Sequence, residues 1–178
     1  MSLLADRLLA VDEALERAEL PHAFGGAIAL GYCTLEPRGT RDLDLNVFVA
    51  PERVKEVFAA LPDGVTVTAL NVEQAERDGQ VRVWWQDTPI DVFLDVLPLH
   101  AEVAREVRRV PFAGGTIPVL GCGALAVFKA MFDRTRDWAD IEAMVEAKAL
   151  DVEAAAARVR ALEGDDSLRA GRLLALRG

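Results

Sequence analysis

Apolar residues near the start of the chain recur at the spacing of an amphipathic helix. Residues 3–19 carry Leu4, Leu8, Val11 and Leu15 three or four positions apart, and Pro21 follows. This periodicity predicts a helix that ends before the proline. A second apolar segment, residues 23–35, contains Gly25-Gly26 near its beginning. Small residues allow a sharp turn and a close backbone approach, so we expect another helix to begin at this glycine pair.

The next segment, residues 42–49, alternates strictly between two kinds of side chain. One set is Asp42, Asp44, Asn46 and Phe48, and the other is Leu43, Leu45, Val47 and Val49. A period of two places successive side chains on opposite faces of a strand. The pattern therefore predicts a strand with one aliphatic face and two carboxylates on the other.

Shorter patterns predict the rest of an α+β fold. Pro51 opens a helix to residue 61, strand-like runs lie at 65–68, 81–85 and 90–96, and the last two form a hairpin through 86–89. A helical stretch at 99–107 precedes a hairpin at 109–119 that turns at Gly114-Gly115. Alanine-rich helical sequence follows Gly123. We expect a core over residues 1–120, with a short mixed sheet flanked by helices, and a helical tail over 121–178 packed on it.

Composition narrows the class of protein. With 52% hydrophobic and 28% charged residues in 178, the chain has the apolar content of a globular domain. Its longest nearly apolar stretches, 23–33 and 119–128, fall short of the roughly 20 residues that span a bilayer. The N-terminus lacks the pattern of a secretory signal. We expect a cytoplasmic protein without a membrane segment.

Charge, cysteine and histidine restrict the chemistry. The net charge of −9 argues against a surface built mainly to bind nucleic-acid phosphates. Cys33 and Cys122 lie in apolar segments, which predicts reduced, buried thiols. Neither His22 nor His100 has the ligand spacing of a zinc site. Any metal is therefore expected to be held by oxygen atoms.

The most informative group is Asp42 and Asp44, two carboxylates on one strand face. Their repulsion is unfavourable unless a cation lies between them. A solvated strand face would explain the same pattern without any ligand. The preceding Gly25-Gly26 favours a metal site, because a helix start offers N–H groups to phosphate while carboxylates hold magnesium. The combined features suit a nucleoside triphosphate.

The order of these motifs resembles the signature of the DNA polymerase β-type nucleotidyltransferase superfamily. Gly25-Gly26 is followed, after a helix-length gap, by Arg38-x-Thr40-x-Asp42-x-Asp44. The run Leu125 to Lys129 and the later Arg134-x-Arg136-Asp137-x-x-Asp140 resemble the helical motif of small bacterial members, especially those similar to AbiEii-type toxins. The likeness covers about residues 20–145.

The resemblance implies roles for particular residues. Asp42 and Asp44 would ligate Mg²⁺ or Mn²⁺, with Asp91 as the third metal-binding and catalytic carboxylate and Asp95 as its alternative. Nucleotide-binding residues would be Gly25, Gly26, Arg38, Thr40 and Lys129. In the two-metal scheme the third carboxylate helps to activate the attacking hydroxyl, and the metals stabilise charge on the α-phosphate and on pyrophosphate.

The helical tail has simpler explanations as well. Lys129 could be a lysine whose stem packs on apolar neighbours while its ammonium reaches water. Arg134, Arg136, Asp137 and Asp140 could form a solvated helix face with ion pairs three or four residues apart. Asp137 and Asp140 could also tie the tail to the core.

The expected function is transfer of a nucleoside monophosphate from a nucleoside triphosphate, such as ATP, to an acceptor hydroxyl. RNA, a protein and a small molecule are the candidate acceptors. If the protein is the toxin of a toxin–antitoxin pair, an antitoxin is a further partner. The negative net charge of the chain favours a basic antitoxin. Many active members have Ser or Thr after the glycine pair, where this chain has Ala27. The alternatives are a non-catalytic nucleotide-binding or interaction module, and a domain whose two acids are only a polar strand face.

Overall fold

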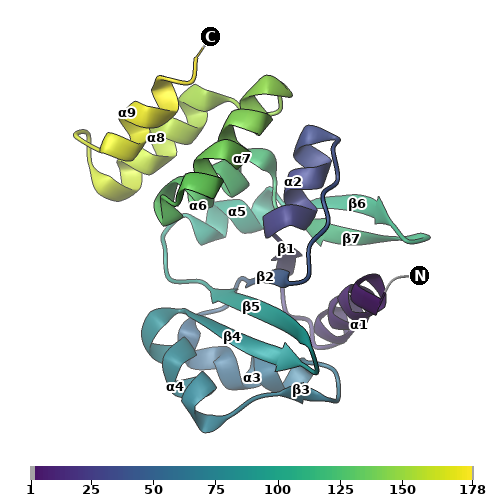
Figure 1. Ribbon diagram of the computed structural model, residues 1–178. Helices are drawn as coiled ribbons and strands as arrows, with labels where there is room; N and C mark the ends of the chain where they lie inside the picture. Colours follow the sequence, from purple (N-terminus) through teal and green to yellow (C-terminus); the bar gives the residue numbers. More distant parts are fainter. Residues whose placement is uncertain (1–2, 178) are drawn as a thin grey trace. The chain divides into compact units, whose positions relative to one another are not determined.

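The computed structural model describes residues 3–177 and contains a seven-stranded mixed sheet (Figure 1). Its strand order is β3-β4-β5-β2-β1-β7-β6. The β2–β5 and β1–β7 pairs are parallel and the other pairs are antiparallel. The strands are β1 (His22–Phe24), β2 (Leu43–Val47), β3 (Val65–Thr66), β4 (Gln80–Trp85), β5 (Thr88–Leu94), β6 (Arg108–Phe112) and β7 (Gly115–Val119). The predicted α+β architecture with a mixed sheet is confirmed.

Helices precede, interrupt and follow these strands. They are α1 (Leu3–Arg17), α2 (Gly26–Thr34), the 3-10 helix η1 (Pro51–Arg53), α3 (Val54–Ala60), α4 (Ala69–Asp78), α5 (His100–Arg105), α6 (Cys122–Phe132), α7 (Thr135–Glu146), α8 (Val152–Glu163) and α9 (Leu168–Leu174). Among the described residues, no helix combines the length and apolarity needed to cross a bilayer.

The chain divides into two compact units. The first comprises the residues up to Gly26 and those from Gly39 to Val119, and it contains the whole sheet. The second comprises Ala27–Arg38 and the residues from Leu120 onward. Most of α2 therefore belongs with the C-terminal helices, although the sequence places it before the central strands.

The centre of the first unit is the parallel pair β2 and β5. Leu43, Leu45 and Val47 lie opposite Ile90, Val92 and Leu94, and all six side chains are buried. The intervening positions place Asp44 opposite Asp91. Because neighbours in register share a face of the sheet, the aliphatic rows form the core and the acids lie together on the other face. The alternation of residues 42–49 predicted this separation of aliphatic and acidic side chains.

Two elements of the first unit were not predicted. Strand β1 has only three residues, and the apolar segment that contains it looks continuous with α2. Helix α4 buries a single residue, Ala75, so it lacks an apolar stripe. Local signals mark its ends instead: Thr68 and Asn71 form a capping box, and Gly79 ends the helix with φ of 67°.

The hairpin between β4 and β5 turns more tightly than expected. Trp85 pairs with Thr88, so the turn is Gln86-Asp87 rather than the four residues 86–89. Gln86 accommodates the tight turn with a left-handed φ of 55°. Pro89 lies within β5, opposite Trp84. This two-residue turn sets which β4 residue faces each β5 residue, including Asp91.

The second unit is a group of helices in which α6 packs against α7, α8 and α9 (Figure 1). Trp138 of α7 is almost fully buried, and its indole N–H donates a hydrogen bond of 2.7 Å to Asp133. The Arg172 guanidinium of α9 lies 4.1 Å from the centre of the Trp138 ring. These contacts join the last helix to the middle of the group.

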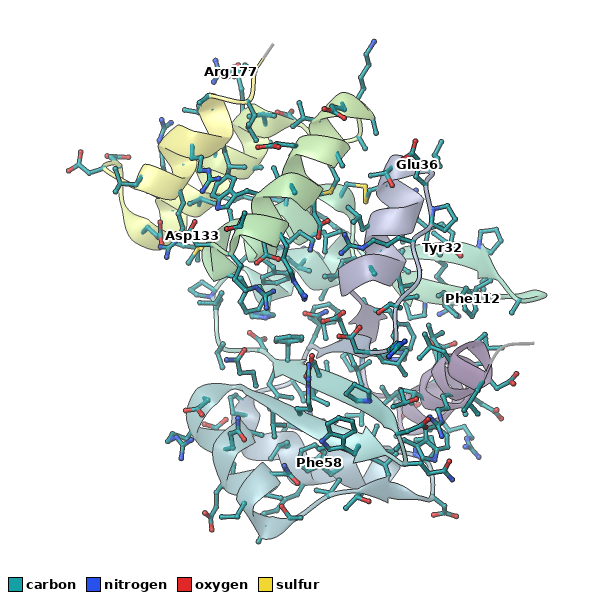
Figure 2. All side chains as sticks on the ribbon, in the orientation of Figure 1. Tyr32, Glu36, Phe58, Phe112, Asp133 and Arg177 are labelled. Carbon is teal, nitrogen blue, oxygen red and sulfur yellow. A yellow bond between two sulfur atoms is a disulfide. The ribbon has the colours of Figure 1, made fainter. Side chains whose placement is uncertain are left out.

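The expectation of reduced thiols is wrong: Cys33 of α2 and Cys122 of α6 form a disulfide (Figure 2). The two residues are 89 positions apart in sequence, and their Cα atoms lie 5.7 Å apart. Such a pair meets only through the fold, so no local spacing announces it. The bond connects α2 covalently to the C-terminal helices of the second unit.

Candidate active site

The candidate site of the first unit follows one row of residues across three neighbouring strands. Asp44 of β2 lies opposite Asp91 of β5, and Asp91 lies opposite Arg82 of β4. All three positions are in register, so their side chains leave the same face of the sheet. The structure thus brings two of the three predicted carboxylates together and adds a cation to them.

The glycine pair borders this row on the side of β1. The Gly25 N–H donates a backbone hydrogen bond of 2.8 Å to the Asp44 carbonyl. Gly26 has φ of 50°, and a β-carbon added there would lie 1.7 Å from Asp44 Oδ2. No side chain larger than hydrogen fits beside this carboxylate. Because the Gly25 N–H is already bonded, the pair's visible role is to let the start of α2 approach Asp44.

Asp42 lies just before the first residue of β2, two positions from Asp44. Its carboxylate accepts a hydrogen bond from the Thr40 hydroxyl, whose oxygen also receives the Asp42 backbone N–H at 3.4 Å. Thr40, predicted to bind nucleotide, therefore orients Asp42 in this structure. A hydroxyl that holds one carboxylate oxygen leaves the other oxygen available to a ligand.

Asp91 and Arg82 form the strongest polar contact of the site. Arg82 Nε donates to Asp91 Oδ1 and Nη2 to Oδ2, each at 2.6 Å. Hydrogen bonding to Asp91 raises the pKa of Arg82 above its ordinary value, and the charges of Asp42 and Asp44 contribute in the same direction. Sequence reasoning missed Arg82, although counting back across the two-residue turn would have placed it opposite Asp91.

Asp95, the alternative third carboxylate, lies elsewhere. It follows the end of β5, its N–H donates to the Val49 carbonyl, and its carboxylate is 3.4 Å from His100 Nδ1. It lies four positions beyond Asp91, which corresponds to roughly 13 Å of extended chain. The strand register favours Asp91 over Asp95 as the neighbour of Asp44.

The donor set of this row fits Mg²⁺ or Mn²⁺, because it consists of carboxylate oxygens with a close glycine backbone beside them. In residues 3–177, however, no choice of one oxygen each brings Asp42, Asp44 and Asp91 within 4.8 Å of one another. Asp12, Glu16 and His22 meet that criterion. The predicted acids are therefore adjacent without being drawn into a closed ligand set.

The cluster of Asp12, Glu16 and His22 was not predicted from the sequence. His22 Nε2 is 2.9 Å from Asp12 Oδ1, and Nδ1 is 2.8 Å from the Leu20 carbonyl oxygen. Glu16 accepts a hydrogen bond of 2.8 Å from Arg109. His22 begins β1, whereas the glycine pair follows its end, so this group lies at the other end of the strand from Asp44. Each member already has a protein partner.

The second unit contains the two predicted nucleotide-binding cations, and both contact Asp140. Arg38 donates two hydrogen bonds to its carboxylate, at 2.7 and 3.2 Å. Lys129 Nζ donates to Asp140 Oδ2 at 2.6 Å. Lys129 is only 7% exposed, so the alternative of a lysine reaching into water is wrong. Asp140 holds both cations in fixed positions within this unit.

Asp137 is a further buried carboxylate beside Lys129. Its side chain is fully buried, so it does not belong to a solvated helix face, and it lies 3.5 Å from Lys129 Nζ. Arg134 Nε donates to it at 2.6 Å. Burial alone would raise the pKa of Asp137, but the hydrogen bond from Arg134 and the charge of Lys129 hold it below its ordinary value.

No model of a protein family matches the chain, and a search of the curated proteins finds no match. Solved structures do match along nearly its whole length. The antibiotic-resistance factor ANT(2″)-Ia in its solution structure superposes with a TM-score of 0.60 and 16% identity, over 97% of this chain and 94% of that one. Its crystal structure in complex with adenylyl-2″-tobramycin gives 0.56 and 15%, over 98% of each chain.

A third structure is the lincosamide antibiotic adenylyltransferase LnuA with lincomycin bound. It superposes with a TM-score of 0.54 and 13% identity, over 80% of this chain and 96% of that one. These likenesses show that the chain has the nucleotidyltransferase fold, as the ordered motifs predicted. The narrower resemblance to AbiEii-type toxins stays a prediction.

Replacing Gly26 by Ala is expected to destabilise the first unit. The left-handed φ and the clash with Asp44 together cost about 1–3 kcal/mol of unfolding free energy. Gly39→Ala is the matched control, because nothing lies within 4 Å of a β-carbon there. Urea unfolding measures both variants. Equal midpoints for the two would contradict the close contact between Gly26 and Asp44.

Asp137→Asn is expected to lower the unfolding free energy in a pH-dependent way. A pKa held below its unfolded value means that ionised Asp137 stabilises the fold above about pH 4, and that this contribution is lost as the pH falls through the folded pKa. The loss should be about 1–3 kcal/mol at pH 7 and shrink toward zero in acid. Urea unfolding between pH 3 and 7 tests this, with the exposed Asp165→Asn as control. A deficit independent of pH would count against the lowered pKa.

Proposed function

We propose that this protein is a metal-dependent nucleotidyltransferase that transfers a nucleoside monophosphate from a triphosphate to a hydroxyl group of a small molecule. The observation that carries the proposal is the register of Asp44 with Asp91, beside Gly26, in a chain with the nucleotidyltransferase fold. Two acids on adjacent parallel strands repel each other without a cation. The arrangement is suited to a ligand that carries positive charge between them.

The residues of the row divide the work by position. Asp42 and Asp44 would bind Mg²⁺ or Mn²⁺ together with Asp91. When bound, the metal supplies positive charge that stabilises the transferred phosphoryl group and the pyrophosphate that leaves. Thr40 keeps Asp42 oriented, and Gly26 lets its own backbone lie close to Asp44. These contacts reduce the reorganisation that substrate binding requires.

In the proposed reaction Asp91 accepts the proton of the acceptor hydroxyl. The acceptor oxygen forms a bond to the α-phosphorus, and the bond from that phosphorus to the bridging oxygen breaks, so pyrophosphate leaves. Asp91 suits this role because its carboxylate is partly exposed, with 21% of the side chain accessible. An acceptor can therefore reach it, as general base catalysis requires.

Lys129 and Arg38 are proposed to contribute positive charge to triphosphate binding, as the sequence motifs imply. Asp140 would position both, since its carboxylate already holds each cation in the second unit. A buried lysine kept in place by a carboxylate loses less side-chain entropy when it binds an anion.

A small, positively charged acceptor is the class we favour. The chain carries a net charge of −9, which attracts cations and disfavours polyanionic RNA. Two of the similar structures hold an antibiotic or its adenylylated product, adenylyl-2″-tobramycin in one and lincomycin in the other. A toxin with an antitoxin partner and an RNA or protein acceptor stay predictions from the sequence alone.

Ala27 favours a second candidate, a module that binds a triphosphate without turning it over. The hydroxyl missing there would contribute a hydrogen bond of about 1–3 kcal/mol to a charged phosphate.

The cytoplasmic location also stays a prediction. The disulfide between Cys33 and Cys122 speaks against it, because disulfides persist mainly in oxidising compartments.

The test is transfer of label from α-labelled nucleoside triphosphates, each offered in turn with Mg²⁺. Tobramycin, lincomycin, a pool of small RNA and a mixed protein extract serve as acceptors. Asp44→Asn should lower transfer about a thousandfold or more, because a ligand of the reacting centre is lost. Asp63→Asn, which removes an exposed carboxylate in the same unit, should leave the rate unchanged.

Each outcome decides between the candidates. Transfer by wild type and Asp63→Asn, but not by Asp44→Asn, supports the enzyme and names its nucleotide and acceptor. Triphosphate binding without pyrophosphate release favours the binding module. Equal transfer by wild type and Asp44→Asn would show that the candidate site is not where the reaction occurs.

A further inference from the structure

Arg82 places a cation on Asp91, one of the carboxylates proposed to bind the metal. Both of its donating nitrogens face Asp91, one to each carboxylate oxygen, at 2.6 Å. A bidentate pair of this kind occupies one lone pair on each oxygen and places a positive charge where a metal ion would approach. Asp91 in this state is therefore a poorer metal ligand than its place beside Asp44 implies.

The contact is also built to open. The Arg82 side chain is 49% exposed, while the Asp91 side chain is 21% exposed. Arg82 lies on the exposed face of β4. The flanking Val81 and Val83 are buried on the opposite face and keep the backbone in place. The guanidinium can thus rotate into solvent without disturbing the core. Because half of the Arg82 side chain is exposed, water can replace the hydrogen bonds that the guanidinium loses when it leaves Asp91.

We propose that Arg82 is a displaceable cation: it neutralises Asp91 while the site lacks a divalent ion, and it moves to the triphosphate once the carboxylates hold one. The inference rests on the proposed function and extends it to a residue outside the family motif. A divalent ion and a guanidinium on the same carboxylate repel each other, and a guanidinium remains charged at every working pH. A guanidinium that leaves a carboxylate is well matched to phosphate oxygens, which it binds with the same two-pronged geometry.

The electrostatics of the row agree with this exchange. The negative charges of Asp42 and Asp44 also attract the Arg82 guanidinium. Without a divalent ion the guanidinium contributes positive charge beside Asp91. Once a divalent ion is present, its repulsion on Arg82 and the negative charge of a triphosphate both favour the second position.

The test measures Mn²⁺ binding to the nucleotide-free protein by the loss of the free-ion electron paramagnetic resonance signal. Arg82→Gln should bind Mn²⁺ about tenfold more tightly than wild type, because the competing cation is gone. Arg82→Lys should lie between the two, since lysine keeps the charge and loses the fork. Arg53→Gln breaks a comparable exposed pair, with Glu56, and should match wild type.

A second arm measures binding of a non-hydrolysable triphosphate in saturating Mn²⁺. Arg82→Gln should bind it about tenfold more weakly, the reverse of its effect on the metal. A pair that is only structural would not move the two affinities in opposite directions. Unchanged or weaker Mn²⁺ binding by Arg82→Gln, in a variant with the wild-type circular dichroism spectrum, overturns the proposal. Unchanged triphosphate binding overturns the second half of it.

Asp44→Asn separates this inference from the proposed function. If Asp44→Asn binds Mn²⁺ as wild type does, the metal site itself is wrong and both proposals fail. If Asp44→Asn loses Mn²⁺ and Arg82→Gln gains nothing, the metal site stands and only the displaceable cation fails.

Discussion

The parallel pairing of β2 with β5 is the constraint on which the candidate site depends. It buries three aliphatic pairs on one face and, by the same register, sets Asp44 beside Asp91 on the other. A slip of one residue would exchange the faces and bury the acids. The hydrophobic core and the site are therefore specified by one alignment. The stability of the aliphatic rows holds in place two charges that repel each other.

Within the first unit, the positive charge of Arg82 offsets part of the repulsion between these carboxylates. Arg82 is held by the β4–β5 register and bonds both oxygens of Asp91, and the backbone of Gly26 lies directly against Asp44. The second unit also pairs charged side chains with one another. There Asp140 binds Lys129 and Arg38, and the disulfide fixes α2 to α6. In both units, charges predicted to act on a ligand are partnered by other residues of the chain.

The sequence predicted what depends on local pattern. Alternation marked β2 and assigned its acids to one face, and the resemblance to nucleotidyltransferases singled out Asp91 as the third carboxylate. Arg82 escaped because a turn of four residues was expected where the structure has two, which shifts every partner across the hairpin. Contacts between different elements had no local signal. The Cys33–Cys122 bond and the approach of His22 to Asp12 both arise from how the segments fold together.

The most direct test of the account is a crystal structure with Mn²⁺ and a non-hydrolysable triphosphate, with the metal located by its anomalous scattering. The account predicts a peak bound by carboxylate oxygens of Asp44 and Asp91, with Arg82 turned away from Asp91 toward phosphate. A peak at Asp12, Glu16 and His22 instead, with the Arg82–Asp91 pair intact, would contradict it.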